Sequence, residues 1–166
     1  MSLQRREHNQ QVDSRRGLNY NMIQKIIHEG QLLAIIISHK FNESGIHFFT
    51  DDDLSQQLAY MKHPVGKIID PHVHNPVKRE VLYSQEVLLI KKGSLRVDFY
   101  TEEQKYLESR VLEAGDVILL IYGGHGFEVL EKLEMFEVKQ GPYAGDSDKT
   151  RFESSLPNDL NFGNSE

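Results

Sequence analysis

The stretch Gly66-Lys-Ile-Ile-Asp-Pro-His72-Val-His74, followed after eleven residues by Glu86-Val-Leu-Leu-Ile-Lys-Lys-Gly93, carries the strongest structural pattern of this chain. Its first part has the pattern of a β-strand, whose successive side chains point to opposite faces. His72 and His74 would then share one face, about 6.6 Å apart along the strand. One divalent ion can bind between two imidazoles so placed. The second part begins with a carboxylate and runs through an apolar strand into a glycine turn.

The pattern of residues 66–139 is nearly all β. Short apolar runs recur about every 8–12 residues between turns rich in glycine and charge, which is typical of an antiparallel sandwich or barrel. In one run Leu95, Val97 and Phe99 would share a face. The expected strands cover residues 67–74, 86–91, 94–101, 108–112, 116–121, 127–130 and 133–139.

The part of the chain before residue 66 predicts one or two short helices and three strands. Apolar side chains between Met22 and Ile27 recur at helical spacing. Asn21 can cap the start of a helix and Gly30 can end it, which predicts a helix over 21–29. The aspartates before residue 54 favour a second, short helix over 54–57, because carboxylates stabilise the first turn of a helix. The expected strands here cover residues 31–41, 46–50 and 58–62.

The composition limits the domain count and the kind of site. A chain of 166 residues predicts one domain, and the absence of cysteine excludes disulfides and thiolate metal sites. A net charge of −6 argues against a nucleic-acid surface. There is no apolar run of about 20 residues for a membrane span and no apolar stretch for a signal peptide at the start. These patterns predict a cytoplasmic protein.

Polar segments flank the predicted domain. Residues 1–17 have no apolar periodicity and predict a flexible arm. Residues 18–143 would form the single domain, with the motif core at 66–139, and residues 144–166 a polar tail. Phe152 is one apolar residue of that tail that can pack back on the domain.

The spacing of the histidines, glutamates and glycines resembles the two motifs of the cupin family. Gly66-x5-His72-x-His74…Glu86-x6-Gly93 resembles the first, and Gly115-x5-Ile121-x-Gly123-x-His125 resembles the second. The resemblance covers roughly residues 55–143 and implies an all-β chain folded as a cupin-type double-stranded β-helix, or jelly-roll barrel. With the patterns above, we expect this barrel to carry one or two short N-terminal helices.

The resemblance also implies a metal centre. Its ligands would be His72, His74, Glu86 and His125, a set that suits divalent Fe, Mn, Ni, Zn or Cu. Glu80 competes with Glu86 as the carboxylate, but Glu86 has the parity of the apolar positions 88 and 90, which would face the interior.

The sequence departs from the cupin pattern in three ways. Eleven residues separate His74 from Glu86 where the family has three or four, Ile121 replaces a proline, and His125 comes one residue early, with Val129 at the position of an asparagine. The first departure fits an extra loop, since added loop length costs little free energy.

Two further residues are candidates for catalysis. Arg79 can bind an anionic substrate through its planar fork, or be a solvated loop charge. Tyr122 can be a proton donor or a packing ring.

The turn Gly123–Phe127 and the ending Phe136–Tyr143 resemble small bacterial cupins found with polysaccharide and nucleotide-sugar assembly genes. This resemblance implies a metal-binding cupin acting on a sugar or another small polar metabolite, and a homodimer in which strand 31–41 pairs with or packs on the partner subunit. Two alternatives stay open. One is a non-catalytic module that binds a sugar, and the other is a metal-free sugar isomerase or epimerase with a histidine as base and Tyr122 as acid.

Overall fold

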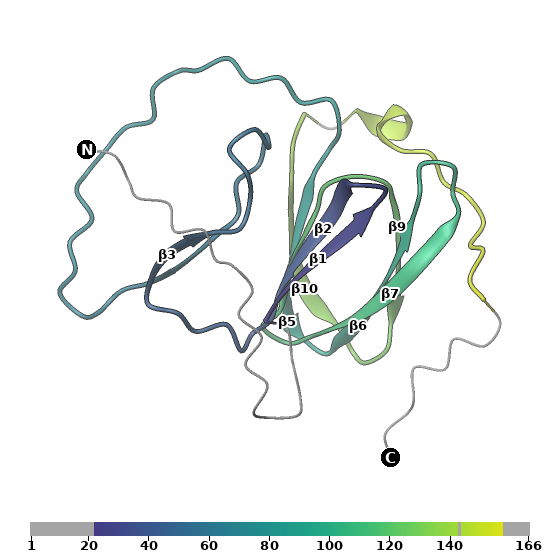
Figure 1. Ribbon diagram of the computed structural model, residues 1–166, viewed down its shortest axis with the longest axis horizontal. Helices are drawn as coiled ribbons and strands as arrows, with labels where there is room; N and C mark the ends of the chain where they lie inside the picture. The colour runs from purple at the N-terminus through teal and green to yellow at the C-terminus, as the bar shows by residue number, and fades with distance from the viewer. Residues whose placement is uncertain (1–21, 143, 158–166) are drawn as a thin grey trace.

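The computed structural model describes residues 22–142 and 144–157 and is built of β-strands with one short 3₁₀ turn (Figure 1). No α-helix occurs in this part of the chain, and no helix there is long and apolar enough to cross a membrane. The all-β class is therefore confirmed. The elements are β1 (Ile23–His28), β2 (Gln31–Ile37), β3 (Gly45–Phe48), β4 (Ala59–Lys62), β5 (Glu86–Lys92), β6 (Ser94–Tyr100), β7 (Tyr106–Glu113), β8 (Val117–Leu120), β9 (Gly124–Val129), β10 (Glu134–Lys139) and η1 (Gly145–Asp148).

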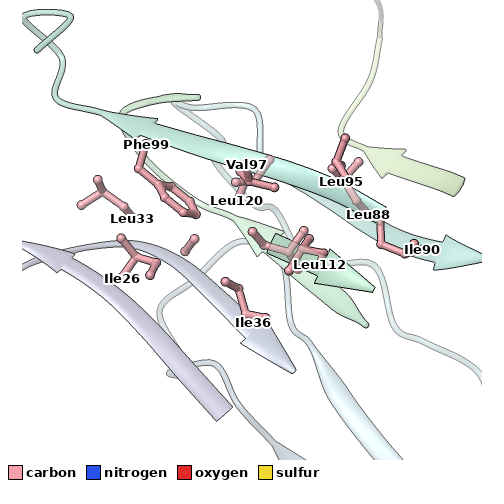
Figure 2. Packing of buried hydrophobic residues seen from close by; sticks show 12 residues of the cluster. Ile26, Leu33, Ile36, Leu88, Ile90, Leu95, Val97, Phe99, Leu112 and Leu120 are labelled. Atoms are coloured by element: carbon pink, nitrogen blue, oxygen red, sulfur yellow. The ribbon is translucent and has the colours of Figure 1, made fainter. Parts of the chain in front are cut away.

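Two antiparallel sheets pack face to face as a sandwich. One has the strand order β1-β2-β8-β5-β10 and the other the order β7-β6-β9. The main core between them takes side chains from both sheets, among them Leu88 and Leu120 from the first and Val97 and Phe99 from the second (Figure 2). Each fully buried side chain of this size stabilises the fold by about 1.5–3 kcal/mol. The predicted shared face of Leu95, Val97 and Phe99 is confirmed, since all three lie in this core.

The outer face of the five-stranded sheet is also covered over β2 and β8. Ile35 and Leu119 project to that side and pack with Phe41, and the β3–β4 hairpin adds Tyr60 to the same apolar cluster. A sheet buried on both faces needs continuous apolar strands rather than alternating ones. This explains the unbroken apolar runs of β2 and β8. Strand β2 is hydrogen-bonded to β1 on one side and to β8 on the other, so residues 34–37 have no free edge.

The predicted helix over 21–29 is wrong, because residues 23–28 form strand β1. Its hairpin with β2 turns through Glu29 and Gly30, whose φ angles of 49° and 80° suit the tight turn that matches strand twist. A bulge between Ile26 and Ile27 interrupts the alternation of side chains. That irregularity imitates helical spacing in the sequence. Asn21, the expected cap, lies outside the described residues.

The predicted helix over 54–57 is wrong as well. Residues 51–56 form turns, and the Gln57 amide holds them by donating to the carbonyl oxygens of Asp51 at 2.8 Å and Leu54 at 2.9 Å. The aspartates therefore begin a turn instead of a helix.

The most consequential error concerns the strand predicted over 67–74. Residues 63–85 contain no strand and form a long exposed connection, drawn in teal as a wide arc outside the sheets (Figure 1). Pro71 and Pro76 have no N–H to donate to a strand ladder. Ile68 and Val73 are 75% and 83% exposed, so no packing holds the segment on a sheet.

The strand that begins at Glu86 is confirmed, and its far end is fixed by Gly93. This residue alone separates β5 from β6 and has a φ of 81°. A Cβ atom added there would lie 2.3 Å from the backbone oxygen of Lys132, which leaves room for glycine only. Glu86 and this turn thus lie at the two ends of one strand, β5.

The other predicted strands are confirmed to within a few residues, strand 31–41 being shortened to β2. In the tail, Phe152 packs back as predicted, with its ring centroid 5.1 Å from that of Tyr100. The predicted arm at 1–17 and residues 158–166 of the tail lie outside the described residues.

Candidate functional site

Glu86 and His125 face each other at one end of the sandwich. Glu86 opens β5 and shares its face with Leu88 and Ile90, which are 1% and 0% exposed. His125 lies on β9 directly opposite Phe99 of the core, and residues paired in this way project to the same side. The two side chains therefore come from opposing sheets and meet between them.

The two side chains form an ion-pair contact that we call the dyad. Nε2 of His125 lies 3.3 Å from Oε2 of Glu86, and the side chains are 29% and 16% exposed. A hydrogen bond from His125 lowers the pKa of the Glu86 carboxyl below its ordinary value, and this outweighs the burial that raises it. Glu86 is consequently ionised at neutral pH.

Lys139 supplies a third charge next to the dyad. It lies opposite Glu86 in the β5–β10 ladder, with its Nζ 4.0 Å from a Glu86 oxygen. The same Nζ is 3.6 Å from Glu137 and 3.9 Å from Asp148 of η1. Glu137 and Lys139 thus lie on the face of the dyad.

This edge of the sandwich is accessible to solvent. Phe127 and Val129 have the inward parity of His125, yet they are 41% and 57% exposed. The strands β9 and β10 are edge strands of different sheets, so neither is covered by a further strand. The His125 and Glu86 side chains are themselves partly exposed, so solvent reaches the dyad.

The other two predicted metal ligands lie elsewhere. The rings of His72 and His74 contact each other, with centroids 5.3 Å apart at 77°, in the exposed connection 63–85. Within the described residues, no three histidine, aspartate or glutamate side chains gather closely enough to hold a metal ion. In this structure the four implied ligands thus form two separate pairs, Glu86 with His125 and His72 with His74.

The remaining candidates do not join the dyad. Glu80 and Tyr122 line a pocket beside the outer face of the five-stranded sheet, where the ring of Tyr122 packs edge-on against Tyr83 at 5.1 Å. Arg79 is exposed in the connection and its guanidinium donates to the Val77 carbonyl oxygen at 3.3 Å. Of the two competing carboxylates, the structure brings Glu86 to His125.

Sequence reasoning missed the pocket that contains Glu80 and Tyr122. Gln85 is buried at its wall, and the available signal was the alternation of Gln85 with Glu86, which sends neighbouring side chains to opposite faces. Asp53 also lines the pocket, although its position in the sequence suggested only the start of a helix.

Comparison of the chain with protein-family models, with curated proteins and with solved structures found no match.

Proposed function

We propose that this chain is a cupin-type enzyme that moves a proton on a small polar metabolite such as a sugar. In this proposal His125 is the base and Glu86 is the residue that positions it. The observation that carries the proposal is the contact between the two side chains at a solvent-accessible end of the sandwich. The motif resemblance at 115–125 and the antiparallel two-sheet fold support the cupin type.

In this proposal the two ring nitrogens of His125 have different roles. Glu86 accepts a hydrogen bond from Nε2–H, so Nδ1 is the atom that can receive a proton from substrate. The lowered pKa of Glu86 keeps the carboxylate charged, and that charge stabilises the imidazolium formed when the proton arrives. Returning the proton to a different atom or face of the substrate completes an isomerisation or epimerisation, with no net gain or loss of atoms.

The surroundings of His125 suit a molecule with both apolar and polar groups. The ring centroid of Phe127 lies 5.3 Å from that of the His125 imidazole, and Nζ of Lys139 lies 4.0 Å from a Glu86 oxygen. A sugar offers C–H faces to the ring and hydroxyl or carbonyl oxygens to the lysine. The resemblance to cupins found with nucleotide-sugar genes points to the same class.

Deuterium exchange tests this proposal. The protein would be incubated in D2O with a panel of nucleotide sugars and free sugars, and NMR would follow loss of the C–H signals. We expect exchange with at least one substrate, and a fall of about 10²–10⁴-fold for His125→Gln, the usual contribution of a positioned base.

The matched control is His72→Gln, which removes an imidazole from the exposed connection and should leave the rate unchanged. Exchange that persists in His125→Gln would contradict the role of the histidine. A complete lack of exchange, together with equal sugar binding by wild type and variant, would contradict the enzyme and favour a binding module that does not use the dyad.

Metal binding is a second proposal, favoured by the preformed contact of the His72 and His74 rings. A shared ion would require the connection to bring this pair to Glu86 and His125. Elemental analysis of purified protein tests it, and His72→Ala and His125→Ala should each abolish stoichiometric metal. If both variants keep their metal, the ligand assignment is wrong.

We also propose a homodimer. Leu89, Phe136 and Val138 share the outer face of β5 and β10 and are 41%, 61% and 59% exposed, which offers an apolar contact surface. Light scattering tests this, and the monomer mass of 19.2 kDa would contradict it.

A further inference from the structure

A pocket of about 430 Å³ lies against the outer face of the five-stranded sheet, on the other side of that sheet from the dyad. Its wall is formed by Gln31 and Tyr122 from the sheet side, by Asp53 from the turn after β3, and by Glu80, Tyr83 and Gln85 from the end of the connection. Pockets of this size hold small organic molecules. The proposed proton transfer makes no use of it.

Gln85 contributes a buried hydrogen-bond acceptor without a partner to the pocket wall. The residue is 5% exposed, and its amide oxygen is buried without a hydrogen bond. Its backbone N–H is held by the side-chain oxygen of Gln140, so the residue is fixed in place. A buried acceptor left unpaired costs about 1–3 kcal/mol, and a donor brought by a ligand would remove that cost.

The charges of the pocket limit what that ligand can be. Asp53 and Glu80 contribute two carboxylates, and the described side chains that line the pocket include no lysine, arginine or histidine. A phosphate or carboxylate group would be repelled there. Carboxylate and amide oxygens accept hydrogen bonds, so the ligand must offer several donors.

Two aromatic rings add an apolar surface. Tyr83 and Tyr122 pack edge to face with centroids 5.1 Å apart, and Tyr83 is 54% exposed. Glu102 accepts a hydrogen bond from Tyr122 and raises the pKa of that phenol to about 12. The phenol is therefore neutral at physiological pH, and an aromatic ring offers a face on which C–H groups pack.

We propose that this pocket binds a neutral, unphosphorylated sugar or a similar polyol. Hydroxyl groups of such a molecule supply donors to Asp53, Glu80 and Gln85, while its C–H face packs on Tyr83. The site is separate from the dyad and does not rest on the proposed enzymatic function, because Gln85 and Glu86 project to opposite faces of the same sheet.

NMR titration of the full chain with glucose, galactose, mannose and N-acetylglucosamine tests the proposal, with the 6-phosphate of each sugar as its charged counterpart. We expect saturable binding of at least one neutral sugar and at least tenfold weaker binding of its phosphate. Glu80→Gln, on the exposed connection, and Gln85→Leu should each raise the dissociation constant at least tenfold. Such a change matches the loss of one hydrogen bond to a charged or buried group.

A control variant and the location of the NMR shifts define the site. Glu43→Gln removes an exposed carboxylate outside the pocket and should not change the affinity. The sugar should shift the signals of Tyr83, Gln85 and Tyr122 and leave those of Glu86 and His125 in place, so failure of this proposal is distinguishable from failure of the dyad. The proposal is overturned if no sugar of the panel saturates, if the phosphates bind as tightly, if Glu80→Gln leaves the affinity unchanged, or if Mg²⁺ or Ca²⁺ alone is the ligand.

Discussion

The four predicted metal ligands form two pairs of side chains, and the two pairs are held in place in different ways. Glu86 and His125 meet because two strands place them there, each in fixed register with a strand of its own sheet. His72 and His74 also meet, but on a connection that contains no strand. Proximity of two side chains alone therefore does not define a site, because only the first pair has a scaffold that fixes its geometry.

Limited proteolysis is the measurement in which the two regions should differ most. Local opening of an exposed connection costs almost nothing, whereas cleavage in the sandwich requires much of the global unfolding free energy, about 5–15 kcal/mol. Within residues 22–157, trypsin should cut first after Lys67, Lys78 or Arg79, orders of magnitude faster than after Lys91. Mass spectrometry of early fragments checks this. First cuts within β5 to β10 would show that the sandwich opens more easily than the exposed connection.

The next largest contrast concerns packing. Leu88→Ala leaves a cavity in the main core and should lower the free energy of unfolding by about 2–5 kcal/mol. Val73→Ala on the connection should change it by less than about 0.5 kcal/mol, because Val73 is 83% exposed. Urea denaturation measures both. A similar loss in the two variants would mean that the connection packs on the sandwich in solution.

A smaller, pH-dependent effect is expected for the dyad. Glu86→Gln should cost about 1–3 kcal/mol at pH 7, since it removes a charged acceptor from a half-buried contact. The pKa of Glu86 is lowered in the folded chain, so its contribution is present above the ordinary carboxyl value of 4.5 and is lost as the pH falls through the folded value. Unfolding curves of wild type and variant should therefore converge in acid. A difference independent of pH would indicate packing instead of charge.

The smallest effect should come from the exposed pair. His72→Ala removes a ring that contacts His74 and a hydrogen bond to the Asp70 carbonyl oxygen, both at the surface. The free energy of unfolding should change by less than about 0.5 kcal/mol without metal. Added Zn²⁺ sharpens the comparison, because a rise in the melting temperature of wild type that is absent in His72→Ala would show that this pair holds the ion.

The sequence predicted that Glu86 faces the interior because strand parity is a local property. Leu88 and Ile90 mark the inward face of β5, and counting back by two reaches Glu86. The same counting places His125 with Phe127 on β9. Tight hairpin turns then transmit the register, as Gly93 does between β5 and β6.

The sequence did not predict the pocket or the connection because both depend on contacts that are distant along the chain. Asp53 and Gln85 come together only after the hairpin layer folds over the sheet. The apolar residues Ile68 and Val73 imitate a strand, but a strand needs a partner, and none in the described chain pairs with that segment. In β1, the bulge at Ile26 broke the period on which the helix prediction depended.

The single glycine between β5 and β6 has a consequence for how the length of this chain can vary. Because Gly93 allows no other residue, β5 acts as a spacer of fixed length from that turn to the first carboxylate of the strand. Deleting one residue from the spacer would move Gln85 to the position of Glu86 and Glu86 to the position of Val87 on the outer face, so the amide instead of the acid would face His125. Insertions in the preceding connection would leave Gln85 and Glu86 on their present faces, so length differences among variants of this protein should accumulate there.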